Sequence, residues 1–129
     1  MERRVVPAES PFVATVGYSR AVRVGPHVHV SGTAPIMPGE GEPPVDPYEQ
    51  AKRCLEIVVA ALAEVGARPE DVVRTRAYLT EADDWKDVGR AHGEVFGDIR
   101  PTLSLVHVLP FLDPKMLVEI ELVAQKSAS

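Results

Sequence analysis

Two stretches of the chain carry apolar residues at steps of three and four, the spacing that predicts a helix buried along one side. The first begins after Asp46 and Pro47, residue types that suit the N-cap and the first helical position, and Gly66 ends it. The second spans about residues 82–96, and Gly97 follows it. The apolar stripe of the first helix is Ala51, Cys54, Leu55, Val58, Leu62 and Val65, and that of the second is Trp85, Val88, His92, Val95 and Phe96.

Most other apolar residues alternate with polar ones, which is the period-two pattern of β-strands. Gly25 and Pro26 separate two such strands and predict a hairpin turn, whereas the proline- and glycine-rich residues 35–47 predict a loop. This order indicates an α+β fold, in which two helices cover one face of a mixed sheet of about four to six strands. The predicted strands are residues 21–24, 27–31, 72–79, 103–108 and 117–123, with a further one at residues 3–6.

The other face of this sheet is predicted to be uncovered. In the last strand Val118, Ile120 and Leu122 point toward the helices, so Glu119 and Glu121 point away from them. An uncovered and partly apolar sheet face usually marks an interface. We therefore predict a homo-oligomer that packs sheet against sheet.

The two strands at residues 72–79 and 103–108 also have distinct faces. In the first, Arg74 and Arg76 are candidates to pair with Glu119 and Glu121, because a carboxylate removed from water needs a partner. The alternative is that all four side chains are solvated. The predicted faces are Val73, Thr75, Ala77 and Leu79 against Arg74, Arg76 and Tyr78 in the first strand, and Leu103, Leu105, His107 and Leu109 against Ser104, Val106 and Val108 in the second.

The composition is that of a folded protein, with 129 residues of which 45% are hydrophobic and 26% charged. We expect one domain over residues 1–129. The formal net charge of −5 opposes a nucleic-acid-binding surface, which needs clustered Lys and Arg. No apolar run approaches the roughly 20 residues of a membrane span, and the N-terminus lacks the apolar core of a signal peptide. We therefore expect a cytoplasmic protein, in which the single Cys54 forms no internal disulfide.

Four motifs distinguish this chain from an arbitrary α+β protein. They are YSRAV at residues 18–22, VHVSGTAP at 28–35, PTLS at 101–104 and VEIE at 118–121. Together they span nearly the whole chain and resemble the RidA family, also called YjgF, whose older label is endoribonuclease L-PSP. The resemblance implies a chorismate-mutase-like fold and a homotrimer that holds a small molecule in clefts between neighbouring subunits. It also implies hydrolysis of 2-imino acids, or their enamine tautomers, to 2-keto acids and ammonia, without a metal or cofactor.

The resemblance implies roles for particular residues. Glu119 matches the glutamate that positions the attacking water, and Tyr18 matches a tyrosine that lines the cleft, so these two are the expected catalytic residues. Ser31 and Gly32 match the strand end that contributes backbone groups. The chain departs from the family at Leu103, where active deaminases carry an arginine that clamps the substrate carboxylate through two parallel hydrogen bonds.

Other expected cleft positions also differ from the common family pattern. Leu105 takes a position that is often Cys or Ala, and Gly89 corresponds to an asparagine often found in the second helix. Ser104 and His107 are further cleft residues, and a histidine there has the chemistry of an acid, a base or a ligand donor near neutral pH. Arg100 lies close in sequence to the missing clamp, which leaves open whether it replaces that arginine.

The other histidines have two interpretations each. His27 and His29 share a strand face, where they either pack at an interface or form a metal pair, and the sequence offers no third ligand nearby. We predict no metal site. His92 lies on the apolar stripe of a helix, which favours a packed and hydrogen-bonded histidine over a functional one.

Three functions remain open from the sequence. The first is a hydrolytic deaminase of reactive imines or enamines, which Glu119 and Tyr18 favour and Leu103 opposes for 2-imino acids. The second is a non-catalytic small-molecule-binding or regulatory trimer, which the missing clamp favours. The third is an RNA-directed role, which the acidic charge and an aromatic content of 5% oppose. The sequence therefore leaves open whether the protein is an enzyme.

Overall fold

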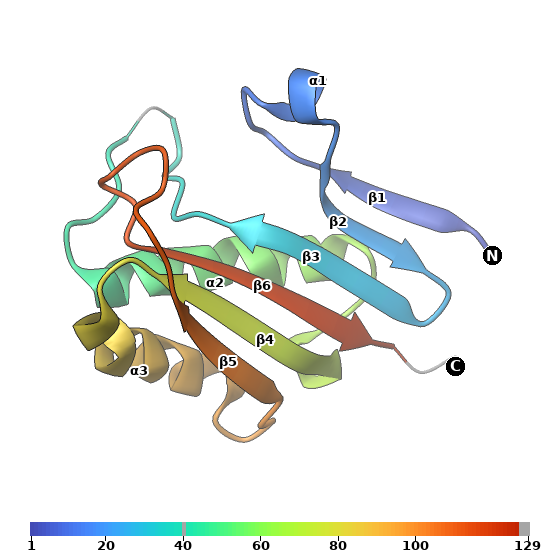
Figure 1. Ribbon diagram of the computed structural model, residues 1–129. Helices are drawn as coiled ribbons and strands as arrows, with labels where there is room; N and C mark the ends of the chain where they lie inside the picture. The colour runs from blue at the N-terminus through green and yellow to red at the C-terminus, as the bar shows by residue number, and fades with distance from the viewer. Residues whose placement is uncertain (40, 127–129) are drawn as a thin grey trace.

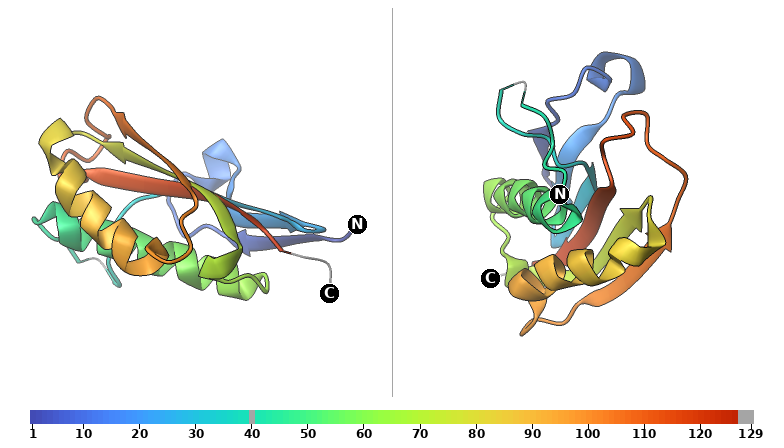
Figure 2. Two further views of the ribbon diagram at one scale, coloured as in Figure 1. Left: turned by 90° about the horizontal axis from the view of Figure 1, so that it is seen from below. Right: turned by 90° about the vertical axis from the view of Figure 1, so that its left-hand side faces the viewer.

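The computed structural model describes residues 1–39 and 41–126 and contains a six-stranded mixed sheet in the order β1-β2-β3-β6-β4-β5. Helices α2 and α3 lie on the same side of this sheet (Figures 1 and 2). Among the strands that the structure describes, only β4 and β5 pair in parallel, as expected for strands joined by a helical crossover. The strands are β1 (Arg3–Pro7), β2 (Ser19–Val24), β3 (His27–Thr33), β4 (Val72–Leu79), β5 (Thr102–His107) and β6 (Val118–Gln125). The helices are α1 (Val13–Val16), α2 (Pro47–Glu64) and α3 (Trp85–Phe96), with short 3-10 turns η1 (Pro69–Asp71) and η2 (Ala82–Asp84).

The predicted α+β fold, with two helices on one face of a mixed sheet, is confirmed. Each predicted strand is present, with ends that differ by at most two residues from the predicted ones. The short helix α1 has no counterpart in the prediction, because four residues are too few to show a helical period.

The caps of α2 are those that its sequence predicts. The carboxylate of Asp46 accepts a hydrogen bond from Tyr48 N at 3.3 Å, and Pro47 occupies the first turn. The helix ends at Glu64, and Gly66 follows with a left-handed φ of 76°. Its predicted apolar stripe is buried, from Ala51 to Val65.

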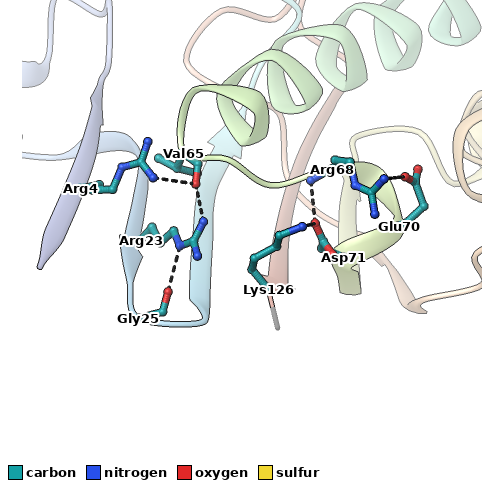
Figure 3. A network of polar contacts seen from close by, with 8 residues as sticks. All are labelled: Arg4, Arg23, Gly25, Val65, Arg68, Glu70, Asp71 and Lys126. Atoms are coloured by element: carbon teal, nitrogen blue, oxygen red, sulfur yellow. Dashed lines mark hydrogen bonds and ion pairs between the residues drawn. The ribbon is translucent and has the colours of Figure 1, made fainter. Parts of the chain in front are cut away.

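Two arginines from the sheet satisfy the carbonyl groups at the end of α2 (Figure 3). Arg4 donates to Glu64 O at 3.1 Å and to Val65 O at 3.3 Å, and Arg23 donates to Val65 O at 2.7 Å. The last carbonyls of a helix have no intrahelical donor and carry partial negative charge, so cations are favoured there. These bonds fix the hairpin of β2 and β3 and the edge strand β1 to the helical layer.

The helix α3 differs from the prediction at its start. Residues 82–84 form the 3-10 turn η2, and the α-helix begins only at Trp85. Trp85 is 52% exposed, so its place in the buried stripe was wrongly predicted, whereas Val88 and Phe96 are buried. Gly97 follows the helix where expected, and a Cβ atom there would lie 2.6 Å from Gly93 O, so the position favours glycine.

The faces of β6 are as predicted, and so are those of β4 except at Val73. Val118, Ile120 and Leu122 are buried beneath the helices. In β4 a bulge shifts the register between Val72 and Arg74, so Val72 rather than Val73 points to the helices. Val73 is consequently 46% exposed.

Within residues 1–39 and 41–126, no helix combines the length and the apolar character that crossing a bilayer requires.

Candidate functional site

Glu119 occupies a partly buried position on the sheet face that α2 and α3 leave uncovered. It lies on β6 directly opposite Tyr78 of β4. Burial raises the pKa of its carboxyl, the guanidinium of Arg20 opposes that rise, and the carboxylate of Glu121 adds to it. A carboxyl group with a raised pKa holds a proton more readily than an exposed one, which is the property of a general base working closer to neutral pH.

The backbone of β3 bends where it passes this carboxyl. Val30 pairs with Leu122 and Thr33 pairs with Ile120, so two residues of β3 lie opposite one residue of β6. Those two residues are Ser31 and Gly32, the bulged end of the strand. A Cβ atom on Gly32 would lie 2.9 Å from Glu119 Oε1, which is closer than real side chains approach. The absence of a side chain on Gly32 therefore makes room for the carboxylate.

Arg20 is the cation of this site, and it was not among the site residues predicted from the sequence. Its Nη1 donates to Gly32 O and to Thr33 Oγ1, each at 3.0 Å, and its guanidinium carbon lies 5.9 Å from the ring centre of Tyr18. The predicted hairpin turn at residues 25–26 would have indicated that Arg20 lies near this site. It pairs Ala21 with Val30, and this register places the preceding residue, Arg20, beside the end of β3.

Tyr18 and Ser31 border a hollow of about 310 Å³ on the uncovered face. Ser31 Oγ donates to Ser19 O at 2.7 Å, which joins β3 to the start of β2. Glu121 and His29 also line this hollow. The structure thus brings Tyr18, Ser31, Gly32 and Glu119, which the family resemblance selected, into one neighbourhood.

Glu121 has its own partners on the same face. Tyr78 OH donates to its carboxylate, and Arg76 Nη1 lies 3.7 Å from its Oε1. The predicted pairing of strand arginines with these glutamates therefore holds for Arg76 and Glu121. The cation beside Glu119 is Arg20 of β2 instead.

Four of the other predicted cleft residues, Leu103, Ser104, Leu105 and His107, lie on β5, and three of them face the opposite way. The parallel register pairs Leu103 with Thr75 and Leu105 with Ala77, and both partners are buried beneath the helices. Leu103 and Leu105 therefore point to the helical side of the sheet, yet they remain 42% and 38% exposed. His107 shares their face, and its Nε2 lies 3.2 Å from Thr80 O. Ser104 alternates with them and is exposed on the uncovered face.

Arg100 belongs to neither face of β5. The strand begins at Thr102, and Arg100 stands in the turn after α3 with a left-handed φ of 57°. Its Nε donates to Gly97 O at 3.2 Å, and the side chain is exposed. Alternation along β5 therefore does not determine which way this side chain points.

Two titratable side chains of the helical layer, His92 and Cys54, are packed among their neighbours. His92 Nε2 lies 2.7 Å from Thr75 Oγ1, its ring packs on Phe96 at 4.8 Å, and burial lowers its pKa. These contacts support the interpretation of a packed histidine. Burial likewise raises the pKa of the Cys54 thiol, which disfavours the reactive thiolate. In the part of the chain that the structure describes, no three His, Cys, Asp or Glu residues are grouped to hold a metal ion.

The sequence matches the family model for endoribonuclease L-PSP over residues 8–126. The chain belongs to the RidA/YjgF family. Among solved structures, it is similar to Rv2704 of Mycobacterium tuberculosis, with 44% identity and a TM-score of 0.85 over 96% of this chain and 99% of that one. A RutC family protein of Pyrococcus abyssi is 37% identical over 98% of this chain and 99% of its own.

A third member of the family carries a functional name. The protein called "Putative reactive intermediate deaminase TdcF" of Escherichia coli K12 is 31% identical over 98% of this chain and 99% of its own length. A crystal structure of E. coli TdcF with bound serine has a TM-score of 0.80 at 28% identity, and covers 96% of this chain and 94% of that one. The fold of the present chain is thus that of a family that includes this protein.

Proposed function

We propose that this RidA/YjgF family member hydrolyses a reactive imine, or its enamine tautomer, to a carbonyl compound and ammonia. The observation that carries the proposal is the environment of Glu119. This carboxyl is partly buried, has a raised pKa, and stands against the side-chain-free backbone of Gly32. Such a group is suited to hold a water molecule and to accept its proton.

The reaction that this arrangement supports has two stages. In the first, Glu119 takes a proton from water while the water oxygen bonds to the imine carbon, and Glu119 then gives this proton to the imine nitrogen, which leaves a neutral carbinolamine. In the second, Glu119 transfers the hydroxyl proton of the carbinolamine to its amino nitrogen, the carbon–nitrogen bond breaks, ammonia leaves, and the oxygen becomes the carbonyl oxygen. We assign to the backbone groups at Ser31 and Gly32 the role of holding charge that develops on the reacting atoms. The chemistry requires neither a metal nor a cofactor.

The proposed active unit is a homotrimer with clefts between neighbouring subunits. Within one chain, Glu119 and the pair Leu103 and Leu105 point to opposite faces of the sheet. One cleft that contains both groups requires two copies of the chain, with each copy supplying one face. The exposure of both leucines on a single chain supports such a contact. We further propose that residues 1–129 form a single domain. We also propose that the protein acts in the cytoplasm.

Leu103 and Leu105 determine the substrate class that we propose. A carboxylate without its clamp arginine loses a charge-assisted hydrogen bond of roughly 1.5–3 kcal/mol, or about one to two orders of magnitude in binding. An apolar wall favours an uncharged or more apolar imine over a 2-imino acid. The same departure supports the second candidate function, a non-catalytic small-molecule-binding or regulatory trimer. An RNA-directed role remains opposed by the net charge of −5.

The deciding experiment measures imine hydrolysis for two substrates. One is 2-iminopropionate, generated in situ by an amino-acid oxidase, and the other is an uncharged aliphatic imine of similar size. We expect acceleration of the uncharged imine that is lost in Glu119→Gln and retained in Glu70→Gln, an exposed carboxylate that pairs with Arg68. Fast turnover of 2-iminopropionate would contradict the argument from Leu103. No acceleration of either substrate would favour the binding trimer.

A further inference from the structure

A second hollow lies outside the candidate site, between α2 and the loop that follows β3. Its volume is about 440 Å³, within the range of small-molecule pockets. Val6, Thr33 and Ala61 are among its lining residues and are nearly fully buried, so they form its floor. Ile36, Met37 and Ile57 also line it. We call it the α2 groove.

Two arginines border the α2 groove, and each keeps hydrogen-bond donors free. Arg20 uses Nη1 for Gly32 O and Thr33 Oγ1, and Arg53 uses Nε for Ile36 O at 2.7 Å. Among residues 1–39 and 41–126, the other guanidinium nitrogens of both side chains have no hydrogen-bond or ion-pair partner. Guanidinium groups present paired donors that match the geometry of a carboxylate or a phosphate.

The remaining charges of the groove select between these two anions. Glu9, Glu56 and Glu64 are exposed and line the same hollow. Three carboxylates repel a phosphate dianion more strongly than a monoanion, because the Coulomb energy scales with the product of the charges. The apolar floor contributes nothing to a bare anion, but it removes the hydrocarbon part of an amphipathic ligand from water.

We propose that the α2 groove is a binding site for a small monocarboxylate with an apolar body. The carboxylate lies between Arg20 and Arg53, and the hydrocarbon part packs on Val6 and Ile57. The site is distinct from the uncovered sheet face, since α2 borders it and Glu119 does not.

Arg20 links this groove to the candidate catalytic site. Its Nη1 holds the carbonyl of Gly32, the residue that abuts the carboxylate of Glu119. The positive charge of Arg20 also opposes the raised pKa of Glu119. A bound carboxylate offsets that charge, so occupancy of the groove favours the protonated form of Glu119. By linkage, protonation of Glu119 strengthens binding in the groove by the same factor.

The test is an amide NMR titration of the whole protein with sodium hexanoate, and with 1-hexanol as the uncharged probe of similar length. We expect saturable shifts for hexanoate at residues of the groove floor and of the facing turn of α2, and weaker binding of hexanol. Arg20→Gln should weaken hexanoate binding about tenfold or more, the loss of one charge-assisted hydrogen bond. Arg68→Gln removes an exposed arginine that does not line the groove and should leave binding unchanged.

A second variant keeps the test valid if Arg20→Gln does not fold. Ala60 is exposed on α2 and lines the groove, so Ala60→Glu adds a repelling charge with little cost to the helix. It should also weaken hexanoate binding. Equal affinities for the two probes, or wild-type affinity in both groove variants, would overturn the proposal. So would shifts confined to the hollow beside Tyr18 and Ser31. Groove binding that persists in Glu119→Gln would support it whether or not the protein is a hydrolase.

Discussion

Glu119 Oε1 lies 2.9 Å from the point that a Cβ atom would occupy on Gly32. This contact couples a backbone position on β3 to the carboxyl on β6 that we propose as the general base. We predict that Gly32→Ala displaces the carboxylate and lowers the proposed activity about tenfold or more, the effect of misplacing a catalytic group by about 1 Å. The measurement is imine turnover together with thermal unfolding.

Gly93→Ala is the matched control for that substitution. Gly93 lies on α3, and a Cβ atom there meets nothing within 4 Å. Alanine is the better helix former by about 1 kcal/mol, so this variant should be as stable as the wild type or more so. If Gly32→Ala keeps full activity, the close approach to Glu119 is irrelevant to function.

Arg20→Gln should raise the pKa of Glu119. Burial already raises it, and the guanidinium of Arg20 opposes that rise by favouring the charged carboxylate. Without this cation, burial raises the pKa of Glu119 further, so the protonated form persists to higher pH. The measurement is a pH titration of the side-chain carboxyl carbon by NMR in both proteins. A pKa that stays constant or falls in the variant would show that Arg20 does not act on Glu119.

The same raised pKa predicts how stability depends on pH. A carboxyl with a higher pKa in the folded than in the unfolded protein binds more protons when folded, so its contribution to stability falls as the pH rises from the unfolded value through the folded one. Glu119→Gln has no such group. The difference in free energy of unfolding between variant and wild type should therefore grow in favour of the variant over this interval, as measured by urea unfolding at closely spaced pH values. A difference that does not change with pH would contradict a raised pKa for Glu119.

Thr75→Val tests the polar contact within the helical layer. Thr75 is fully buried and its Oγ1 lies 2.7 Å from His92 Nε2. Valine has the same shape but leaves the imidazole nitrogen unpaired, which should destabilise the protein by about 1–3 kcal/mol. Urea unfolding measures the change, with Thr15→Val at an exposed position of α1 as control. Equal losses in the two variants would mean that the contact with His92 contributes nothing.

The sequence was sufficient to predict the elements in which apolar residues recur at a regular spacing. The stripe of α2 and the alternation of Val118, Ile120 and Leu122 reappear as buried residues, because each follows the geometry of one element. Val73 was misplaced because a bulge in β4 breaks the alternation, and a bulge depends on pairing with another strand. Trp85 was misplaced because the helical period does not separate the first turn of α3 from the 3-10 turn before it.

The candidate site was predictable only as far as the family motifs extend. Tyr18, Ser31, Gly32 and Glu119 were selected by resemblance, and the structure places them near one another. Arg20 lies within the same motif, yet its role depends on the contacts of a long side chain with Gly32 and Thr33, which alternation along a strand does not specify. The opposite orientation of Leu103 follows from its parallel register with Thr75, a contact between elements.

That orientation gives a direct test of the proposed shared cleft. Glu119→Gln should inactivate the uncovered face of a chain, and Leu103→Trp should block the helical side of β5. If each cleft joins the first face of one chain to the second face of its neighbour, mixing the two inactive variants restores intact clefts. Random assembly of equal amounts gives about one quarter of the clefts with both faces intact, and hence about one quarter of wild-type activity. The mixture must first be unfolded and refolded together so that subunits exchange, and each variant refolded alone is the control. Activity no higher than in those controls would mean that Glu119 and Leu103 do not meet across a subunit boundary.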